Sequence, residues 1–147
     1  MKTSIGSCFF AIGLLFLTTT GQSSANLIVN GDFETGTLAG WTVTQAATGS
    51  NLTVEQLPPA HDTLGGAFRA NSSDFDSISQ TFATTPGASY DVSFFYEPIG
   101  FGPPFHNGFR FLFNGVVIYE NLDTGSGFAT FTFTNLQATG SQTTVEF

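Results

Sequence analysis

Two acidic residues near the start of the chain have a spacing that suits a metal ion. Asp32 and Glu34 flank Phe33 at a corner rich in turn residues. Residues two apart in an extended segment point to the same side, so both carboxylates could face one hard cation such as Ca²⁺. In the alternative, Asp32 stabilises the turn at residues 30–32 and Glu34 is solvated. Glu34 and Asp32 are therefore candidate metal ligands, with Glu34 and backbone carbonyls as the main donors.

A loop of glycine, proline and aromatic residues, 96–107, is the candidate ligand site. Its prolines and glycines are expected to hold Phe101 and Phe105 near the surface, where the C–H face of a sugar can stack on their rings. Polar side chains beside them can hydrogen-bond sugar hydroxyls, because ligand sites combine an apolar floor with a few polar groups. In the alternative, both rings fold back under the loop as a separate apolar cluster. The candidate ligand-binding residues are Tyr96, Glu97, Phe101, Phe105, His106 and Asn107.

No residue pattern in the chain indicates catalysis. His61 and Asp62 are adjacent, but two histidines alone give too few ligands for a zinc site. A serine nucleophile would need a Gly-x-Ser-x-Gly motif, which is missing. A glycosidase needs two carboxylates about 5–10 Å apart across a cleft, and the 11 acidic residues can supply such a pair by chance. Asp74 and Asp76 are expected to serve a plain turn, because the repeated Asp or Asn and the glycine of a calcium loop are missing. We therefore expect that the protein is not an enzyme.

The first 25 residues have the pattern of a secretory signal peptide. Lys2 precedes an apolar run from Phe9 to Leu17, and small residues occupy the expected cleavage site. The run is much shorter than the roughly 20 residues of a membrane-spanning helix. We therefore expect cleavage after Ala25, a secreted or cell-surface protein without membrane insertion of the mature chain, and a single domain over residues 26–147.

The mature region is acidic and carries few charges. The full chain has a net charge of −8, and loss of Lys2 leaves Arg69 and Arg110 against 11 carboxylates, a net charge of −9. Nucleic acids and anionic membrane surfaces require clustered Lys and Arg, so neither is expected as a partner. The two arginines are expected to pair with neighbouring carboxylates. Cys8 is the only cysteine and would leave with the signal peptide, so packing must hold the domain together.

Alternation of apolar and polar residues dominates the mature region, and helical periodicity is missing. Turn signals such as Pro86-Gly87 and Asn114-Gly115 separate the alternating segments, a pattern typical of an all-β antiparallel sandwich. Trp41, the only tryptophan, is expected to pack in the core instead of stacking on a sugar. Strands are predicted at residues 27–29, 41–44, 52–55, 67–70, 78–82, 90–97, 109–113, 116–120, 129–134 and 143–147.

Three segments in this order resemble the galactose-binding-like jelly-roll family. They are residues 26–44 (NLIVNGDFETGTLAGWTVT), 79–94 (SQTFATTPGASYDVSF) and 111–116 (FLFNGV). The family includes carbohydrate-binding modules and related domains of secreted bacterial proteins with a C-terminal PEP-CTERM sorting tag. The resemblance covers nearly all of the mature region. It implies a jelly-roll sandwich, an exported protein, binding instead of catalysis, and a structural Ca²⁺ near Phe33-Glu34.

Domains of this family usually close with a strand carrying an Asp-Asp-Val-like segment, which also holds the partner carboxylate of the calcium site. Neither this strand nor the sorting tag occurs before Phe147, so the chain is expected to be a truncated form of the family's domain. If no strand follows, an unpaired sheet edge that could recruit another strand is expected.

The predicted function is non-catalytic binding of carbohydrate or extracellular polysaccharide, with a candidate structural Ca²⁺. The alternative is a structural or adhesion protein of the surface that has no sugar ligand.

Overall fold

Ten strands form in the part of the chain that the computed structural model describes, which comprises residues 8–11, 26–46, 48–56, 64–69, 74–98, 108–122 and 128–147. These residues contain no helix, and every strand pairing is antiparallel. The predicted all-β antiparallel sandwich is thereby confirmed. The strands are β1 (Cys8–Ala11), β2 (Thr42–Thr44), β3 (Asn51–Gln56), β4 (Leu64–Arg69), β5 (Ser77–Ala83), β6 (Ser89–Pro98), β7 (Gly108–Phe113), β8 (Val116–Leu122), β9 (Ala129–Gln137) and β10 (Gln142–Glu146).

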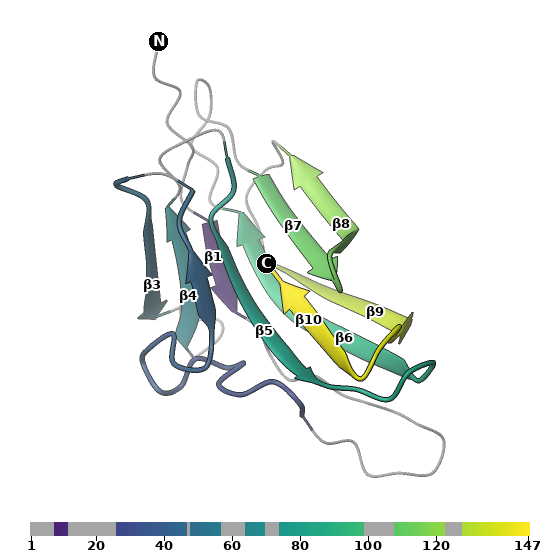
Figure 1. Ribbon diagram of the computed structural model, residues 1–147. Coiled ribbons are helices and arrows are strands. Elements are labelled where there is room, and N and C mark those ends of the chain that lie inside the picture. The colour runs from purple at the N-terminus through teal and green to yellow at the C-terminus, as the bar shows by residue number, and fades with distance from the viewer. Residues whose placement is uncertain are drawn as a thin grey trace.

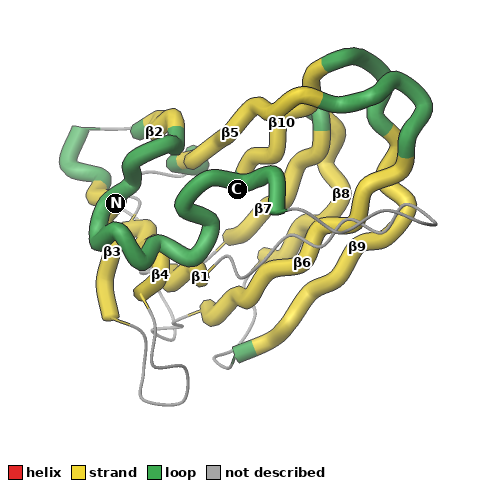
Figure 2. Tube along the Cα trace, turned by 90° about the horizontal axis from the view of Figure 1, so that it is seen from below, coloured by secondary structure: helices red, strands yellow, loops and turns green. Residues whose placement is uncertain are grey.

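The strands form two five-stranded sheets (Figure 1). The first sheet has the order β3-β4-β1-β6-β9, and the second has the order β2-β5-β10-β7-β8. Figure 2 shows the backbone of the two sheets as two layers, seen from below. Of the nine successive pairs of described strands, all but β3–β4 and β7–β8 have one member in each sheet, so the chain repeatedly crosses from one layer to the other.

Phenylalanine fills the space between the layers. Strict alternation in β6 and β7 turns every second residue inward, as the pleat requires. The ring of Phe94, from the first sheet, is completely buried and lies edge-on to Phe111 and Phe147, with centroids 5.3 and 5.0 Å away. Phe111 belongs to β7 and Phe147 follows β10, so these contacts join the two sheets. Edge-to-face ring pairs stabilise a core beyond the area they bury.

The predicted hairpin at Asn114-Gly115 is confirmed. Both residues have positive φ, 55° and 77°, and they join β7 directly to β8. Positive φ at both central positions is the geometry of a type I′ turn, whose twist matches that of the two strands. Asn tolerates this region and Gly enters it without steric strain, so the two residue types fix the register of the hairpin.

The segment before β2 differs from its predicted structure. Residues 27–29 form no strand, and the chain runs in turns up to Trp41. The Gln80 amide takes the place of a strand partner: its Oε1 accepts a bond from Val29 N (2.8 Å), and its Nε2 donates to Val29 O and Gly40 O (both 3.0 Å). A three-residue apolar run followed by Asn30 at positive φ is too short to extend along a sheet. The prediction of a strand there is wrong.

Trp41 packs in the core, as predicted. Its side chain is buried, and its ring stacks on Phe33 with centroids 5.8 Å apart. The indole Nε1 donates a hydrogen bond to Asn30 O (3.1 Å), which satisfies its only polar group. The strand itself begins one residue later, at Thr42.

The middle strand of the first sheet comes from the region predicted to be a signal peptide. β1 lies between β4 and β6 and pairs with both, with Cys8 opposite Phe68 and Pro98. A chain cleaved after Ala25 would lack this strand. At the other end of the chain, the last described strand, β10, lies between β5 and β7 and is not at an edge.

The Gln80 amide is expected to anchor the segment before β2. Gln80→Ala removes three part-buried hydrogen bonds to the backbone, so the free energy of unfolding should fall by about 1–2 kcal/mol. Gln142→Ala, at an exposed position of β10, is the matched control and should change it by less than about 0.5 kcal/mol. Urea unfolding followed by the fluorescence of Trp41 measures both values, and equal losses in the two variants would contradict the anchoring role.

Candidate functional site

The two candidate metal ligands at the first corner each accept a backbone hydrogen bond. Asp32 Oδ1 accepts from Glu34 N (3.3 Å), a local turn interaction. Glu34 Oε1 accepts from Leu64 N (3.0 Å), which ties the corner to the start of β4. Both side chains are exposed. Within the described ranges no group of three or more His, Cys, Asp or Glu side chains could hold a metal ion, so a cation held by Glu34 and Asp32 would need backbone carbonyls and water as its other ligands.

The candidate ligand loop lies largely outside the described residues. Phe101, Phe105, His106 and Asn107 fall there, so their arrangement stays a prediction. Tyr96 lies inside the sandwich: it is 1% exposed, and its ring stacks on Phe109 with centroids 4.2 Å apart. The ring of Tyr96 therefore serves the core and offers no surface to a ligand.

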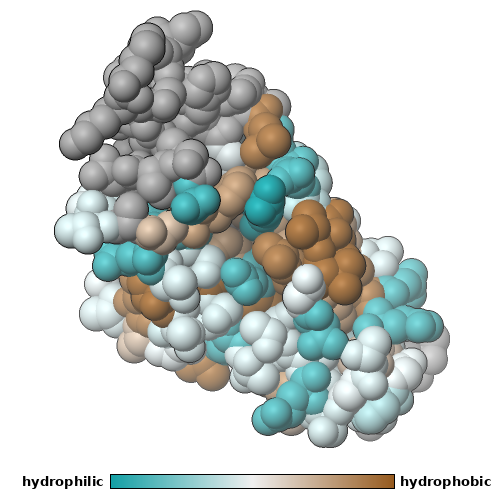
Figure 3. Space-filling view, turned by 45° about the horizontal axis from the view of Figure 1, so that its top comes forward, coloured by the Kyte–Doolittle hydropathy of each residue, from teal (hydrophilic) through white to brown (hydrophobic). Residues whose placement is uncertain are grey.

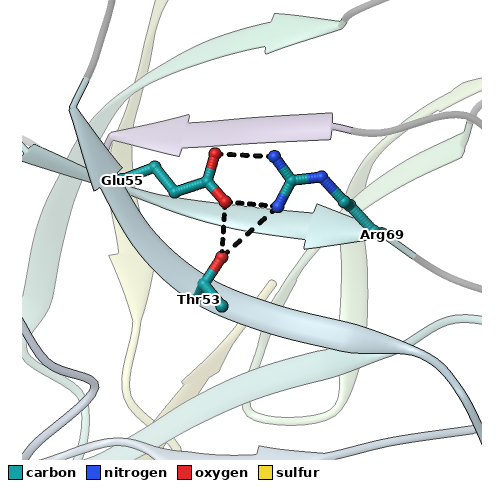
Figure 4. Close-up of polar contacts among 3 residues, drawn as sticks. All are labelled: Thr53, Glu55 and Arg69. Carbon is teal, nitrogen blue, oxygen red and sulfur yellow. Dashed lines mark hydrogen bonds and ion pairs between the residues drawn. The ribbon is translucent and has the colours of Figure 1, made fainter.

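The outer face of the first sheet carries polar side chains that sequence reasoning did not bring together. Arg69, Glu55 and Thr53 form one cluster on β3 and β4, which we call the Arg69 cluster (Figure 4). Arg69 Nη2 donates to Glu55 Oε2 (2.6 Å), and Nη1 donates to Oε1 of the same carboxylate. The hydroxyl of Thr53 donates to Glu55 Oε1 (2.8 Å) and accepts from Arg69 Nη1 (3.4 Å). The two-pronged pairing fixes the orientation of the guanidinium plane.

Strand pairing explains why these three side chains meet. Thr53 and Glu55 are two residues apart on β3 and so share a face of the sheet. Arg69 lies opposite Asn51 on β4, diagonal to Thr53, and a long side chain spans such a diagonal. Each ionised side chain of the cluster is about one-third exposed. The cluster is therefore ordered and still open to solvent.

The Arg69–Glu55 contact sets the ionisation of both groups. The hydrogen bond from Arg69 lowers the pKa of Glu55 below that of an ordinary carboxyl group, against a smaller opposing effect of burial. The pKa of Arg69 is raised by the same contact. Glu55 is thus an ionised acceptor at neutral pH and is poorly suited to donate a proton, whereas the acid of a glycosidase needs a raised pKa.

Hydroxyls and a half-buried acid continue the outer face across β6 and β9. In β6, buried and less buried residues alternate, as the sequence predicted. The less buried ones, which include Ser93 and Glu97, belong to the outer face of the first sheet. The Ser93 hydroxyl lies 3.1 Å from that of Thr132 on β9. Glu97 is half-buried, and its Oε2, which is itself buried, has no hydrogen-bond partner among the described residues.

Register places Glu97 near the Arg69 cluster. Pro98 and Phe68, the chain neighbours of Glu97 and Arg69, both lie opposite Cys8 of β1. In these parallel strands Phe68 precedes Arg69 whereas Pro98 follows Glu97, so Glu97 is level with Ala67, which lies opposite Thr53 of the cluster. Arg69 lies two residues further along, and the backbones of Arg69 and Glu97 are about 12 Å apart, from two strand spacings across and two residues along. Only the strand order reveals this proximity, since β1 intervenes and comes from a distant part of the chain.

The second arginine lies in the other sheet. Arg110 Nε donates to Glu120 Oε1 (2.5 Å) across the β7–β8 pair, and its guanidinium lies 4.1 Å from the ring centroid of Phe75. Both arginines thus pair with neighbouring carboxylates, as predicted.

Comparison with protein-family models, curated proteins and solved structures finds no match to this chain. Among the described residues, no helix is long and apolar enough to cross a membrane.

The Glu55–Arg69 pair predicts a specific dependence of stability on pH. Because the folded-state pKa of Glu55 is lowered, its contribution is present above the pKa of the unfolded chain and is lost as pH falls through the folded-state pKa. Glu55→Gln should therefore lower the free energy of unfolding by up to about 1 kcal/mol at neutral pH, the range for a solvent-exposed pair. The difference from the parent chain should disappear in acid.

Glu146→Gln, on β10, is the control and should show no such pH-dependent difference. Urea unfolding at several pH values measures both variants. A deficit of Glu55→Gln that stayed constant with pH would mean that the charge of Glu55 contributes nothing.

Proposed function

We propose that the chain is an exported, non-catalytic domain that binds a neutral carbohydrate or extracellular polysaccharide. The binding surface is the outer face of the first sheet at the Arg69 cluster and Glu97, continued by the loop that follows β6. The observation that supports it is the register of the first sheet, which brings an oriented Arg–carboxylate pair and the half-buried Glu97 to one face of the same sheet, with Glu97 level with Thr53 in the middle of the cluster.

The chemistry of this face suits sugar hydroxyls. A hydroxyl both donates and accepts, and this face carries a guanidinium, whose N–H groups donate, and a carboxylate, Glu55, which accepts. Hydrogen bonds to charged groups are about twice as strong as neutral ones. Because Arg69 and Glu55 already hold each other in place, binding would order few additional side chains, and the entropic penalty of association falls accordingly.

Aromatic stacking would come from the loop after β6. That loop follows Pro98, the last residue of β6, and Phe101 and Phe105 come three and seven residues after Pro98 in the sequence. The net charge of −8 favours a neutral glycan over a polyanionic one, because like charges repel.

We also propose that the domain is a member of the galactose-binding-like family that its sequence resembles. The repeated crossing of the chain between two antiparallel sheets supports a galactose-binding-like jelly roll of the kind found in secreted bacterial proteins with a PEP-CTERM tag. Export through the predicted signal peptide would place the domain outside the cell. The lowered pKa of Glu55 supports a binding role over hydrolysis.

A structural or adhesion role is the second candidate, and a different observation favours it. Three apolar residues of the edge strand β8 are exposed: Val116 (62%), Val117 (49%) and Leu122 (54%). Figure 3 shows apolar side chains, in brown, gathered on the side of the molecule where β7 and β8 lie. Exposed apolar residues on a free strand edge mark a surface that can bind another protein.

The two arginines provide a matched test of carbohydrate binding. Arg69→Ala should weaken retention on a bound polysaccharide by about 1.5–3 kcal/mol, the range for hydrogen bonds to charged groups. Arg110→Ala, which also breaks an ion pair but on the second sheet, should leave retention unchanged. A glycan array identifies the ligand, and affinity electrophoresis then measures the variants.

Phe101→Ala combined with Phe105→Ala should also reduce binding while leaving the melting temperature within a few degrees of the parent. Collapse of the fold in this double variant would show that the rings pack in the core. Absence of retention on every glycan by a folded sample would remove the carbohydrate proposal and leave the structural one.

We also propose a structural Ca²⁺ at the first corner, with Glu34 and Asp32 as its carboxylate ligands. Calcium at 100 times its dissociation constant should stabilise the chain by about 2.7 kcal/mol, which EDTA would reverse. Glu34→Gln keeps an oxygen able to accept from Leu64 N but loses the charge, so it should abolish the calcium effect with little change in the metal-free melting temperature. An unchanged melting temperature of the parent chain in EDTA and in excess calcium would disprove the site.

A further inference from the structure

The first sheet depends on a middle strand that only four residues supply. β1 runs antiparallel to β4 on one side and to β6 on the other. β4 and β6 also have outer partners, β3 and β9, and among the described strands their inner edges pair with β1 alone. The backbone groups along these inner edges lie in the interior of a sheet, where an unpaired N–H or C=O is strongly disfavoured.

The gap that β1 fills has a fixed width, and its two edges run in the same direction. β4 and β6 are both antiparallel to β1, so they are parallel to each other. They cannot close the gap without moving by one strand spacing, about 4.8 Å. Such a movement would displace Phe94 and Tyr96 of β6 from the rings of the second sheet, Phe111 and Phe109. Core packing therefore keeps the gap open at the width of one strand.

The segment that fills the gap belongs to the predicted signal peptide, and cleavage after Ala25 would remove it. We propose that the gap between β4 and β6 is a strand-binding site: residues 8–11 occupy it before cleavage, and an extended segment of a partner protein occupies it afterwards. The site joins two backbone edges at once, which is the principle of donor-strand complementation. This proposal does not depend on carbohydrate binding.

The residues beside β1 define what the partner segment must contain. The position held by residue 10 pairs with Gly66 and Tyr96, and Tyr96 is buried. Paired residues share a face of the sheet, so an apolar residue is required there. The position held by residue 9 pairs with Ala67 and Glu97 and belongs to the outer face, where a polar residue is tolerated. Proline is excluded from the segment, because both edges need N–H donors.

The test uses the full chain and its Phe10→Pro variant. Amide hydrogen exchange is measured at residues 66–68 of β4 and 95–97 of β6, with the β7–β8 hairpin as an internal reference. If β1 protects the inner edges, exchange at β4 and β6 should accelerate at least about tenfold more than in the hairpin, because local opening exposes only the neighbouring strands.

A synthetic peptide of residues 6–13, with Cys8→Ser and a solubilising tail, is then added to the variant. It should restore protection at β4 and β6, whereas the same peptide with Phe10→Pro should not. A Phe10→Asp peptide should bind at least about tenfold more weakly than a Phe9→Asp peptide, because only the former places a charge on the inner face. If the variant chain does not fold, the peptides are added during refolding, and recovery of native Trp41 fluorescence with the parent peptide alone supports the proposal.

Three results would overturn the proposal. Unchanged exchange in the folded Phe10→Pro chain would show that β1 is not needed. Failure of the parent peptide to restore protection or folding, or equal recovery with its proline control, would show that the site does not bind a strand in trans. Concentration-dependent dimerisation of the variant, with protection recovered in the dimer, would assign the site to a second copy of the chain instead of a partner protein.

Discussion

Packing of aromatic rings between two sheets is the interaction on which the rest of the structure depends. The chain has one cysteine, so no disulfide can form within it. Burial must supply the stability instead, and Phe94 shows how: its ring contacts Phe111 and Phe147, so both layers meet at one fully buried side chain. Burial of large apolar surfaces is the dominant favourable term in folding. The separation and registration of the two sheets follow from these contacts.

A core held in this way leaves the outer faces free to differ. The same pleat that turns Tyr96 inward turns Glu97 outward, so each residue added to the core adds one to the surface. On the first sheet the outward residues include an oriented Arg–Glu pair and hydroxyls, whereas the edge of the second sheet exposes Val116, Val117 and Leu122. Two surfaces of different chemistry thus lie on opposite layers of one small sandwich. One carries hydrogen-bonding and charged groups, and the other carries exposed apolar side chains.

The middle strand of the first sheet links the polar face of that sheet to the predicted processing of the chain. β1 determines the distance from Arg69 to Glu97, since it separates the strands that carry them. It also comes from the segment whose composition predicts removal on export. A sandwich whose core packing holds a strand-wide gap must fill that gap with some extended segment. Whichever segment enters it completes the polar face as well as the hydrogen-bond ladder.

The sequence by itself determined the class of the fold, most strand positions and several local structures. Alternation is a property of neighbouring residues, so it located β5 to β10, and Asn114-Gly115 identified its hairpin because only a few residue types accept positive φ twice. The burial of Trp41 followed from its place at the head of an alternating strand. The strand predicted at residues 27–29 does not form. An apolar run of three residues does not reveal that the side chain of Gln80 takes the place of a strand partner.

Only the tertiary structure decided which residues meet across strands. The Arg69 cluster depends on the diagonal placement of Arg69 and Thr53, and its nearness to Glu97 depends on a strand contributed by residues 8–11. Strand order and register arise from packing between residues distant in the chain. The spacing of residues along the sequence therefore does not predict them. For this reason the sequence indicated an exported sandwich, whereas the polar face and the gap between β4 and β6 emerged only from the assembled sheets.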